Sequence, residues 1–302
     1  MGRAVAPKGR TGIMDPLIFH NDRIVPLSEV HLSPGQTGLL MGWGVFTTLR
    51  LYQGIPLAFE RHWARTARDA VRLEVDLPYK QKAVREVVIE LGRANQRPEG
   101  AVRVSFVKNH GGLWGQAEGL PPTDLLIFTR ELVHWPAANR LQIELMGILS
   151  GGHYAGAKML SWVPHAAVLG RAHETGFDDA LLINERGQIA ECTSANIFLV
   201  RGRTLLTPPL SSGCLGGITR EVIFEIAPRA GLEIREAELT TDDLSTAQEV
   251  FISSTTREVA GVGFISPKWN YPCPGKVTAA VKEVFTKYVD DYLSRAASAG
   301  SA

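Results

Sequence analysis

The sequence predicts an α+β (mixed α/β) protein with two domains. Its 302 residues are enough for two compact domains or one large one. Short β-branched runs separated by turn residues are typical of hairpins, and they gather in the first part of the chain. Apolar residues at helical spacing follow them, and crossover connections come later. This mixture differs from the regular alternation of a doubly wound dinucleotide-binding fold.

Composition narrows the possible functions. Hydrophobic residues make up 45% of the chain and charged residues 21%, as in a globular protein with a sizeable core. The formal net charge of +1 does not indicate a nucleic-acid partner. The first residues do not have the pattern of a secretory signal, and no apolar run reaches the roughly 18–20 residues of a membrane span, so we expect a cytoplasmic protein. The widely spaced Cys192, Cys214 and Cys273 are expected to be reduced thiols, and no metal site is expected.

The chain is predicted to divide at a polar segment that contains a proline. A small α/β domain, residues 14–130, precedes this linker, residues 131–140, and a larger domain, residues 141–294, follows it. A flexible arm, residues 1–13, and an Ala/Ser/Gly-rich flexible tail, residues 295–302, are expected to flank the two domains.

Turn residues and helical periodicity place the elements of the smaller domain. Asn21 and Asp22 stand between two short apolar runs and predict a hairpin. A helix is predicted over residues 60–73, and its buried face is expected to consist of Trp63, Ala67, Ala70 and Val71. Strands are predicted at 45–52, 55–58, 101–107 and 125–129, with a second helix at 81–94.

The larger domain is predicted to mix strands with three helices. Pro164 suits the first turn of a helix that ends before Gly176. The residues Glu-Arg-Gly-Gln at 185–188 are predicted to join two strands as a hairpin. Strands are predicted at 141–149, 179–184, 189 onward, 196–200, 232–239 and 249–253, and helices at 164–174, 218–229 and 277–294.

Lys158 is the first candidate for chemistry. It follows a loop of small residues, SGGHYAGA, and precedes an apolar Met-Leu pair. A single lysine is most often a solvated surface charge. Between a tight loop and a helix, beside apolar residues, a lysine can instead be desolvated. Desolvation lowers the pKa of the amine and leaves it nucleophilic, as a Schiff-base lysine requires.

Glu191 and Asn196 lie just past the predicted hairpin, in the segment AECTSANIFLV. The glutamate is either a solvated charge at a strand edge or a partner for a pyridinium nitrogen. In the second role the carboxylate keeps the ring protonated, so that the ring accepts electrons from a substrate carbanion. Asn196 either supports this glutamate or caps the turn.

Two further segments have the pattern of phosphate sites. The glycine-rich run 213–217 leads into a helix whose first turn holds Ile218 and Thr219, and free N–H groups at a helix start bind phosphate. A plain glycine turn is the alternative. The hydroxyl cluster 253–256 follows a strand and can contact a phosphate or form a simple turn. Arg65, on the first helix, is either a solvated surface residue or a ligand that binds the phosphate through two N–H groups of its guanidinium.

The order and spacing of these segments together resemble the class IV (fold-type IV) aminotransferases. In that family a glutamate is followed five residues later by asparagine and two apolar residues, as at 191–198 here. The family lysine stands about 33 residues before this glutamate, as Lys158 does. The blocks GVFTTLR, FERHWAR, GFDDALLINERGQIAE, LLTPPLSSGCLGGITREVIFEIA and EVFISSTTREV are also similar. The resemblance therefore runs from about Leu17 to Phe285.

The resemblance implies a homodimer of two-domain subunits that bind pyridoxal 5'-phosphate in the cleft between the domains. Lys158 would form the Schiff base and carry a proton between the substrate α-carbon and C4′ of the cofactor. Glu191 would pair with the pyridine nitrogen, next to Asn196. The phosphate would be held by Arg65, Gly217, Ile218, Thr219 and Thr255.

The sequence resembles more than one branch of the family, which contains branched-chain aminotransferases, D-amino-acid aminotransferases, (R)-selective amine transaminases and aminodeoxychorismate lyases. TPP, GGITR and GFDDALLIN are similar to the branched-chain enzymes. Many of those have glutamate at the position of Thr47, and the Thr47-Thr48 pair is similar to the lyases. Val163 replaces a tyrosine that contacts the cofactor, and residues 101–103 keep only the arginine of a Tyr-x-Arg substrate motif. The loop VKNHGGLWG is also closer to that of a lyase.

We therefore expect a transaminase that moves an amino group between an amino acid, hydrophobic or branched-chain, or a related amine, and a 2-oxo acid. The alternatives are an aminodeoxychorismate lyase, which releases pyruvate to give 4-aminobenzoate, and a D-amino-acid or (R)-amine transaminase. A member that only binds the cofactor is disfavoured, because Lys158 and Glu191 are both present. The candidate substrate-binding residues are Phe46, Arg103, Trp114 and Thr256, with Trp43 and Arg257 as further candidates. Core packing is the ordinary role of such aromatic residues, and salt bridging is that of such arginines.

Overall fold

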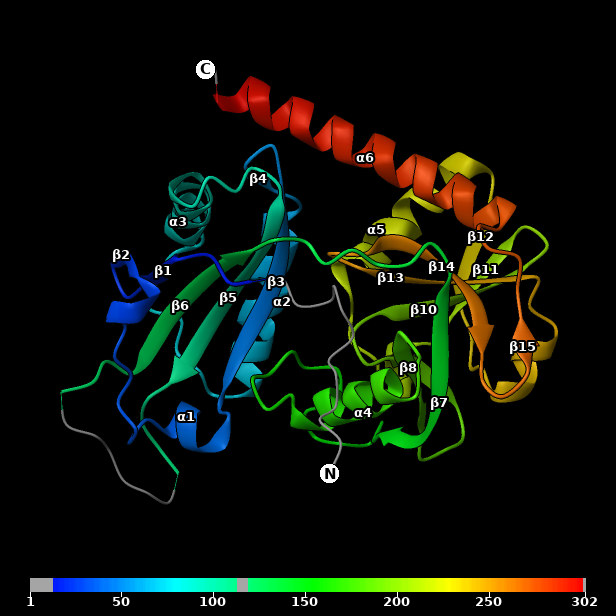
Figure 1. Cartoon of the computed structure of the whole chain (residues 1–302), viewed down its shortest axis with the longest axis horizontal. Coiled ribbons are helices and arrows are strands. Elements are labelled where there is room, and N and C mark those ends of the chain that lie inside the picture. Colours follow the sequence, from blue (N-terminus) through cyan, green and yellow to red (C-terminus); the bar gives the residue numbers. More distant parts are fainter. Residues whose placement is uncertain (1–12, 113–118, 301–302) are drawn as a thin grey trace. The chain divides into compact units, whose positions relative to one another are not determined.

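The chain forms two compact units (Figure 1). A computed structural model describes residues 13–112 and 119–300, with side chains to residue 298. The N-terminal unit comprises Thr11–Val133, Ala157–Trp162 and the chain from Tyr292 onward. The C-terminal unit comprises His134–Gly156 and Val163–Asp291.

The division differs in two respects from a simple split at a linker: Ala157–Trp162 and the chain from Tyr292 onward both belong to the N-terminal unit. It falls after Val133, inside the segment 131–140 that was expected to connect the domains. The short segment Ala157–Trp162, which we expected in the larger domain, packs with the N-terminal unit instead. This segment carries Lys158.

The N-terminal unit is built on a six-stranded antiparallel sheet with the order β2-β1-β6-β5-β3-β4. Its strands are β1 (Leu17–His20), β2 (Arg23–Pro26), β3 (Gly44–Tyr52), β4 (Ile55–Pro56), β5 (Gly100–Lys108) and β6 (Thr123–Arg130). The predicted hairpin is confirmed as β1 and β2, with Asn21 and Asp22 at positive φ in the turn. The other strands predicted here are also present, within a few residues of their expected ends.

Two long helices cover one face of this sheet. Helices α2 (Phe59–Arg72) and α3 (Gln81–Ala94) pack on a core of buried side chains from β3, β5 and β6. The apolar stripe of α3 is buried through Val84, Val88 and Leu91. A short helix, α1 (Thr37–Met41), and a 3-10 turn, η1 (Leu27–Glu29), precede β3.

The buried face of α2 differs from the expectation. Val71 is 80% exposed, and Trp63 and Ala67 are only partly buried. The helix instead buries a polar row at helical spacing, His62, Arg65, Thr66 and Asp69, with Phe59 and Ala70. Ala70 is buried as predicted and Trp63 packs against the core, so the prediction was wrong at Val71. It also missed the polar row, because buried polar groups are stable where hydrogen bonds satisfy them.

The C-terminal unit contains a nine-stranded mixed sheet with the order β12-β11-β10-β13-β14-β7-β8-β9, and β15 pairs with β14. Its strands are β7 (Asn139–Ile148), β8 (Asp179–Asn184), β9 (Ile189–Cys192), β10 (Asn196–Arg201), β11 (Thr204–Thr207), β12 (Glu233–Glu236), β13 (Glu249–Ser254), β14 (Glu258–Ile265) and β15 (Trp269–Asn270). β7 is parallel to both β8 and β14. Parallel neighbours need a crossover, and α4 (Val163–Glu174) lies in the connection from β7 to β8.

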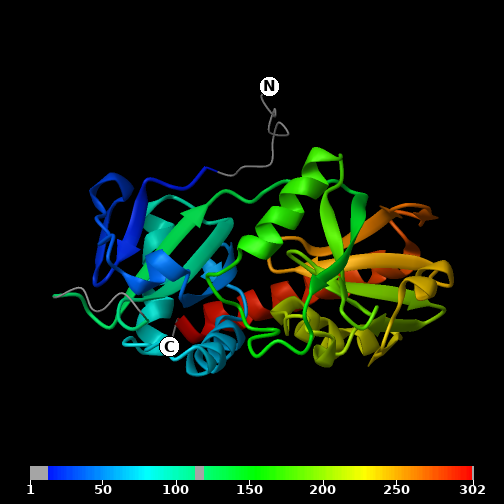
Figure 2. The ribbon, with the colours of Figure 1, turned by 90° about the horizontal axis from the view of Figure 1, so that it is seen from below.

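Helices α4 and α5 pack on the sheet of this unit. Val168 and Ala172 of α4 form a small core with Ala180 and Leu182 of β8, and Figure 2 shows α4 lying over these strands. The other elements are α5 (Ile218–Ile226), η2 (Leu210–Ser212), η3 (Ala227–Ala230), η4 (Thr241–Ser245) and α6 (Lys276–Gly300), whose residues up to Asp291 belong to this unit. The expected tail is helical as far as Gly300, because its alanines favour the continuation of α6.

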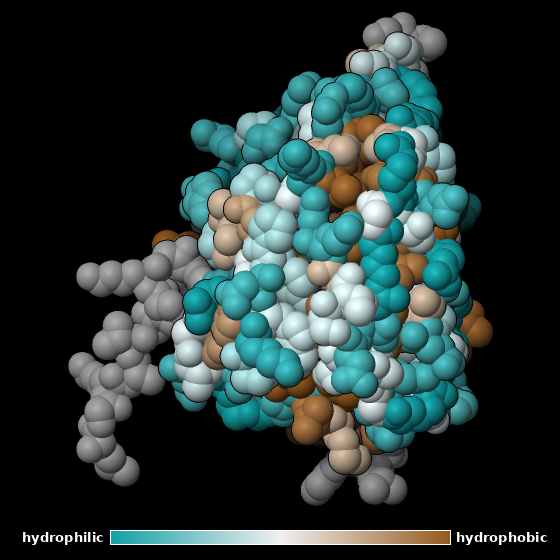
Figure 3. All heavy atoms as spheres, turned by 90° about the vertical axis from the view of Figure 1, so that its right-hand side faces the viewer, coloured by the Kyte–Doolittle hydropathy of each residue, from teal (hydrophilic) through white to brown (hydrophobic). Residues whose placement is uncertain are grey.

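The sequence did not predict α1, β11, β14 or β15. β14 is central in the sheet, but its two glycines disfavour a strand locally and hide its apolar pattern. The end of the C-terminal unit seen in Figure 3 is mainly hydrophilic, with apolar side chains in small groups, as is ordinary on protein surfaces. None of the described helices is long and apolar enough to cross a membrane.

Candidate active site

Lys158 lies in an extended segment that continues the sheet of the N-terminal unit. Its N–H donates to Oδ2 of Asp69, at 3.0 Å. Its carbonyl accepts from the N–H of Phe46, at 3.1 Å, and the N–H of Leu160 donates to the carbonyl of Gly44, at 2.9 Å. The main chain at Lys158 is therefore held on one side by β3 and on the other by α2.

The ring of Phe46 is flanked by two cations. Nζ of Lys158 lies 4.5 Å from the ring centroid and Cζ of Arg103 lies 3.7 Å from it. The two cationic groups are therefore no further apart than the sum of these distances. Burial, and then the neighbouring Arg130, lowers the pKa of Arg103 to about 10, so its guanidinium is charged at neutral pH. No carboxylate in the described part of the chain forms an ion pair with Arg103, which leaves it available to an anionic ligand.

The polar face of α2 meets one hydroxyl of β3. Nη2 of Arg65 donates to Oγ1 of Thr47 at 3.0 Å, and this oxygen lies 2.8 Å from Nδ1 of His62. All three residues are buried. Burial first, and then the positive charges of Arg65 and Lys158, hold the pKa of His62 well below its usual 6.5. The imidazole is therefore neutral at neutral pH, beside a charged guanidinium.

In the C-terminal unit, Glu191 is a buried carboxylate and not a solvated strand-edge charge. It lies on β9 and is 8% exposed. Nδ2 of Asn196, the first residue of β10, is 3.5 Å from Oε2 of Glu191 and donates a shorter bond, 2.8 Å, to the carbonyl of Leu215. Asn196 thus joins the glutamate to the loop that leads into α5.

The start of α5 has the features of an anion site. Its N-cap, Gly217, is extended and makes no side-chain cap, so the N–H groups of the first turn have no acceptor within the helix. A Cβ at Gly217 would overlap Oδ1 of Asn196, which explains the glycine. Ile218 and Thr219, which follow it, are buried. N–H groups in this arrangement bind phosphate.

The hydroxyl cluster lies where β13 turns into β14. Thr255 and Thr256 are half-buried in this tight turn. Ser253, just before it, is the cross-strand partner of Asn196, and the two side chains lie on the same face of the sheet. Oγ of Ser253 is buried and has no hydrogen-bond partner within the described residues. An unsatisfied hydroxyl beside Asn196 fits a polar ligand group at this face.

Arg257, a candidate partner for a substrate carboxylate, has a structural role. Its Nη1 donates to Oδ2 of Asp179 at 2.7 Å, and both side chains are almost fully buried. Its guanidinium also lies over the ring of Trp135, with Cζ 3.6 Å from the centroid. Asp179 accepts a further bond from Oγ of Ser194, at 2.7 Å. The ion pair therefore ties the turn before Asn196 to the turn that carries Thr255 and Thr256.

The predicted site residues fall into two groups, one in each unit. Phe46, Arg65, Arg103 and Lys158 lie in the N-terminal unit, and Glu191, Asn196, Gly217, Ile218, Thr219, Thr255 and Thr256 lie in the C-terminal unit. Trp114 lies outside the described residues. Sequence reasoning included Ser253 in the hydroxyl cluster but did not assign Thr47, His62, Asp69 or Asp179 to the site. The polar row on α2, spaced at helical intervals, was the signal for two of them.

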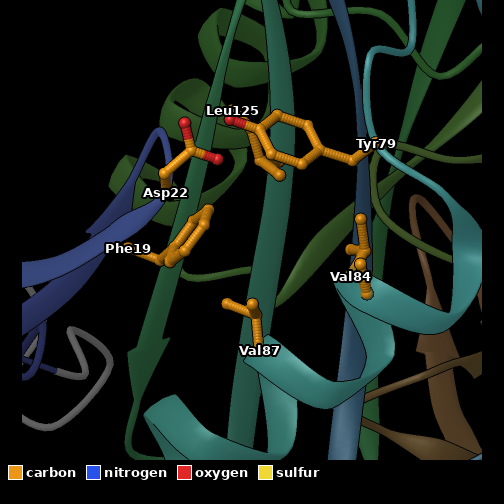
Figure 4. A pocket seen from close by; sticks show the side chains of 7 residues that line it. Phe19, Asp22, Tyr79, Val84, Val87 and Leu125 are labelled. Carbon is orange, nitrogen blue, oxygen red and sulfur yellow. The ribbon is translucent and has the colours of Figure 1, made fainter.

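A separate apolar pocket occurs in the N-terminal unit. Phe19, Asp22, Tyr79, Ala83, Val84, Val87 and Leu125 line it (Figure 4). Burial, and then the hydrogen bond with Asp22, raises the pKa of Tyr79 to about 12. The pocket includes none of the predicted site residues.

Comparison with known proteins decides the family. Residues 44–265 match the family model described as amino-transferase class IV. The chain belongs to this family. Lys158, Glu191 and both candidate phosphate segments lie inside the matched residues. Class IV aminotransferases depend on pyridoxal phosphate, so the protein belongs to a family of pyridoxal-phosphate enzymes.

Relatives of this class IV aminotransferase have several different names. A Methanocaldococcus jannaschii protein, provisionally named a branched-chain-amino-acid aminotransferase, is 29% identical over 284 residues, 89% of this chain and 94% of the relative. A D-alanine aminotransferase of Listeria innocua is 28% identical over 82% of this chain and 87% of its own. An aminodeoxychorismate lyase of Bacillus subtilis is 27% identical over 92% and 96%.

Solved structures show the same fold. The T.th. branched-chain amino acid aminotransferase, complexed with N-(5'-phosphopyridoxyl)-L-glutamate, has a TM-score of 0.82 and is 26% identical over 92% of this chain and 95% of its own. The expectation of a two-domain, fold-type IV α+β enzyme is therefore confirmed.

The residues of this class IV aminotransferase fit pyridoxal phosphate. The fit rests on three observations: the uncapped start of α5, the buried hydroxyl of Ser253 without a partner among the described residues, and the buried Glu191. The N–H groups at the start of α5 suit a phosphate, and the Ser253 hydroxyl suits a polar substituent of the ring. The carboxylate of Glu191 suits a protonated ring nitrogen.

Proposed function

We propose that the chain is a transaminase that moves an amino group between an amino acid, hydrophobic or branched-chain, or a related amine, and a 2-oxo acid. The placement of Lys158 carries the proposal. Its main chain is bonded to Asp69 and Phe46, and its amine lies against the Phe46 ring. These main-chain bonds fix the point from which the lysine side chain extends, which favours covalent chemistry with an aldehyde at a defined place.

Pyridoxal 5'-phosphate, when bound, supplies an aldehyde that takes up the amine and a ring that accepts electrons. We assign Lys158 to its covalent attachment. Glu191, supported by Asn196, holds a positive charge on the ring nitrogen, and burial strengthens this pairing. The phosphate is assigned to Arg65, Gly217, Ile218, Thr219 and Thr255.

Lys158 is also the proposed base. Nζ would take the proton from the α-carbon of the donor and deliver it to C4′ of the cofactor, which is general acid–base work by a positioned amine. Three positive charges, those of Lys158, Arg65 and Arg103, belong to the N-terminal unit.

The substrate residues are proposed on geometry and charge. Arg103 is charged and lacks a carboxylate partner within the described residues, so we assign it to the carboxylate of the amino acid. Phe46, between Arg103 and Lys158, provides an apolar surface for the side chain of the donor. Thr256 is assigned to the same substrate, and so is Trp114.

A lyase that acts on aminodeoxychorismate is the second candidate. The pair Thr47 and Thr48, in place of the glutamate of many branched-chain enzymes, favours it, as does the relative named as such a lyase. A D-amino-acid or (R)-amine transaminase is the third candidate, supported by the D-alanine relative. We further propose a homodimer and a cytoplasmic location, which sedimentation and cell fractionation test.

A half-reaction separates these candidates. The purified protein is loaded with pyridoxal phosphate, and its visible spectrum is recorded. L-leucine, D-alanine, (R)-1-phenylethylamine and aminodeoxychorismate are then added singly, without an acceptor. Conversion to the pyridoxamine form by one of the first three identifies a transaminase and the hand of its donor. Release of pyruvate from aminodeoxychorismate alone identifies a lyase.

The matched control is Lys158→Ala. We expect it to bind pyridoxal phosphate without the visible band of the lysine-bound cofactor and to lose turnover. Full activity in this variant would rule out the assignment of Lys158. A wild-type protein without a visible band after cofactor addition would contradict the cofactor assignment.

A further inference from the structure

Thr47 is a polar residue in an otherwise apolar row. The side chains of Val45, Leu49 and Leu51 point from β3 to the same face and are fully buried, and Thr47, at 4% exposure, lies among them. A hydroxyl in such a position destabilises the fold unless it is hydrogen-bonded. Here its bonds go to α2, to Arg65 and His62.

The direction of these two bonds follows from the donors available. Arg65 can only donate, so Oγ1 of Thr47 accepts from it. The hydroxyl proton of Thr47 then needs an acceptor, and Nδ1 of His62 is the acceptor within reach in the described structure. Nδ1 is therefore unprotonated, and the proton of the neutral imidazole lies on Nε2.

The three residues form a hydrogen-bonded chain that includes the guanidinium of Arg65. His62 orients the Thr47 hydroxyl, and the hydroxyl accepts from Nη2 of Arg65. Arginine has many rotamers, and holding one of them before a ligand arrives reduces the entropy lost on binding. His62 and Arg65 are three residues apart on one face of α2, which keeps the geometry constant.

We infer that Thr47 and His62 are positioning residues that hold Arg65 for the phosphate of the cofactor. The inference rests on the proposed function, because it takes Arg65 as a phosphate ligand. Neither residue touches the cofactor in this scheme. They act through Arg65, so their effect is confined to ligands that carry a phosphate.

The test compares two forms of the cofactor. Dissociation constants of pyridoxal phosphate and of pyridoxal, which lacks the phosphate, are measured from the visible spectrum for the wild type and for Thr47→Val. The valine has the shape of threonine without the hydroxyl. We expect Thr47→Val to raise the dissociation constant of pyridoxal phosphate at least about tenfold, which corresponds to the loss of one hydrogen bond to a charged group. The dissociation constant of pyridoxal should not change.

Conservative variants separate positioning from packing. The quantity compared is the dissociation constant of pyridoxal divided by that of pyridoxal phosphate. Thr47→Ser keeps the hydroxyl and should keep the wild-type value of this ratio. His62→Asn places an acceptor near the position of Nδ1 and should keep most of the ratio, whereas His62→Leu should lower it. Thr66→Val is the matched control, because the Thr66 hydroxyl bonds to the carbonyl of His62 in its own helix, at 2.9 Å, and not to the Arg65 guanidinium.

A double-mutant cycle completes the test. In an Arg65→Ala background, Thr47→Val should have no further effect on the affinity for pyridoxal phosphate. Equal weakening of both cofactor forms by Thr47→Val, or additive effects in the cycle, would overturn the inference while leaving the proposed function intact. A wild type that binds neither form would overturn both.

Discussion

The backbone N–H of Lys158 donates to the carboxylate of Asp69, 89 residues earlier in the chain, across 3.0 Å. Asp69 is buried on α2, and its other oxygen accepts from the guanidinium of Arg68. The aspartate therefore fixes the main chain beside the reactive lysine without using the amine. It belongs to the same polar row on α2 as His62 and Arg65.

Asp69→Ala should loosen the segment that carries Lys158. It removes an acceptor with a full charge, so we expect the free energy of unfolding to fall by about 1.5–3 kcal/mol. Covalent uptake of the cofactor should slow, because the amine is held less well. Urea denaturation and the rate of appearance of the visible band measure the two effects. Asp69→Asn keeps an oxygen acceptor and should be milder; identical behaviour of both variants would contradict this role.

Glu191→Ala should damage catalysis much more than folding. The carboxylate is proposed to hold the positive charge on the cofactor ring, and loss of one such electrostatic contact lowers kcat by about 100–1,000-fold. The unfolding free energy of the cofactor-free protein should change far less. Turnover and urea denaturation give the two values. Glu233→Gln, an exposed glutamate on β12, is the control. If Glu191→Ala binds as much cofactor as the wild type but is much less stable to urea, the role of Glu191 is structural instead.

Asp179→Asn should destabilise the C-terminal unit. It leaves the Arg257 guanidinium buried without its counter-charge, and breaking a buried ion pair costs about 3–5 kcal/mol. The affinity for pyridoxal phosphate should also fall, because Asp179 and Arg257 tie together the turns beside Asn196 and Thr255. Chemical denaturation and cofactor titration test both. Glu283→Gln breaks an exposed helical pair with Lys287 and should have little effect.

The protein should lose stability as the pH falls below about 6.5, in part through His62. The pKa of His62 is 6.5 in the unfolded chain and well below that in the folded one, through burial and then through Arg65 and Lys158. Between the two values the unfolded chain binds a proton that the folded chain does not, which favours unfolding. Above pH 6.5 this contribution is constant. The melting temperature of the wild type should fall more steeply with decreasing pH than that of His62→Asn. If the two plots of melting temperature against pH are parallel, His62 makes no such contribution.

Local patterns in the sequence determined much of the fold and the identity of the central residues. The turn at Asn21 and Asp22, the apolar stripe of α3 and the glycine-led start of α5 depend on neighbours within a few residues, so they could be predicted. The spacing of Lys158, Glu191 and Asn196 led to the family. All of these features depend only on which residues occur and on their spacing along the chain.

Tertiary structure decided which side chains meet. Arg65 on a helix surface has the same local sequence whether it is solvated or buried, and only its packing on β3 brings it to Thr47. The sequence offers Arg257 as a partner for a substrate carboxylate, and only the tertiary structure shows its buried ion pair with Asp179, 78 residues away. The segment of Lys158 joins β3 through bonds that no local pattern encodes. Contacts between residues distant in the chain depend on how whole elements pack, and a single sequence records that packing only indirectly.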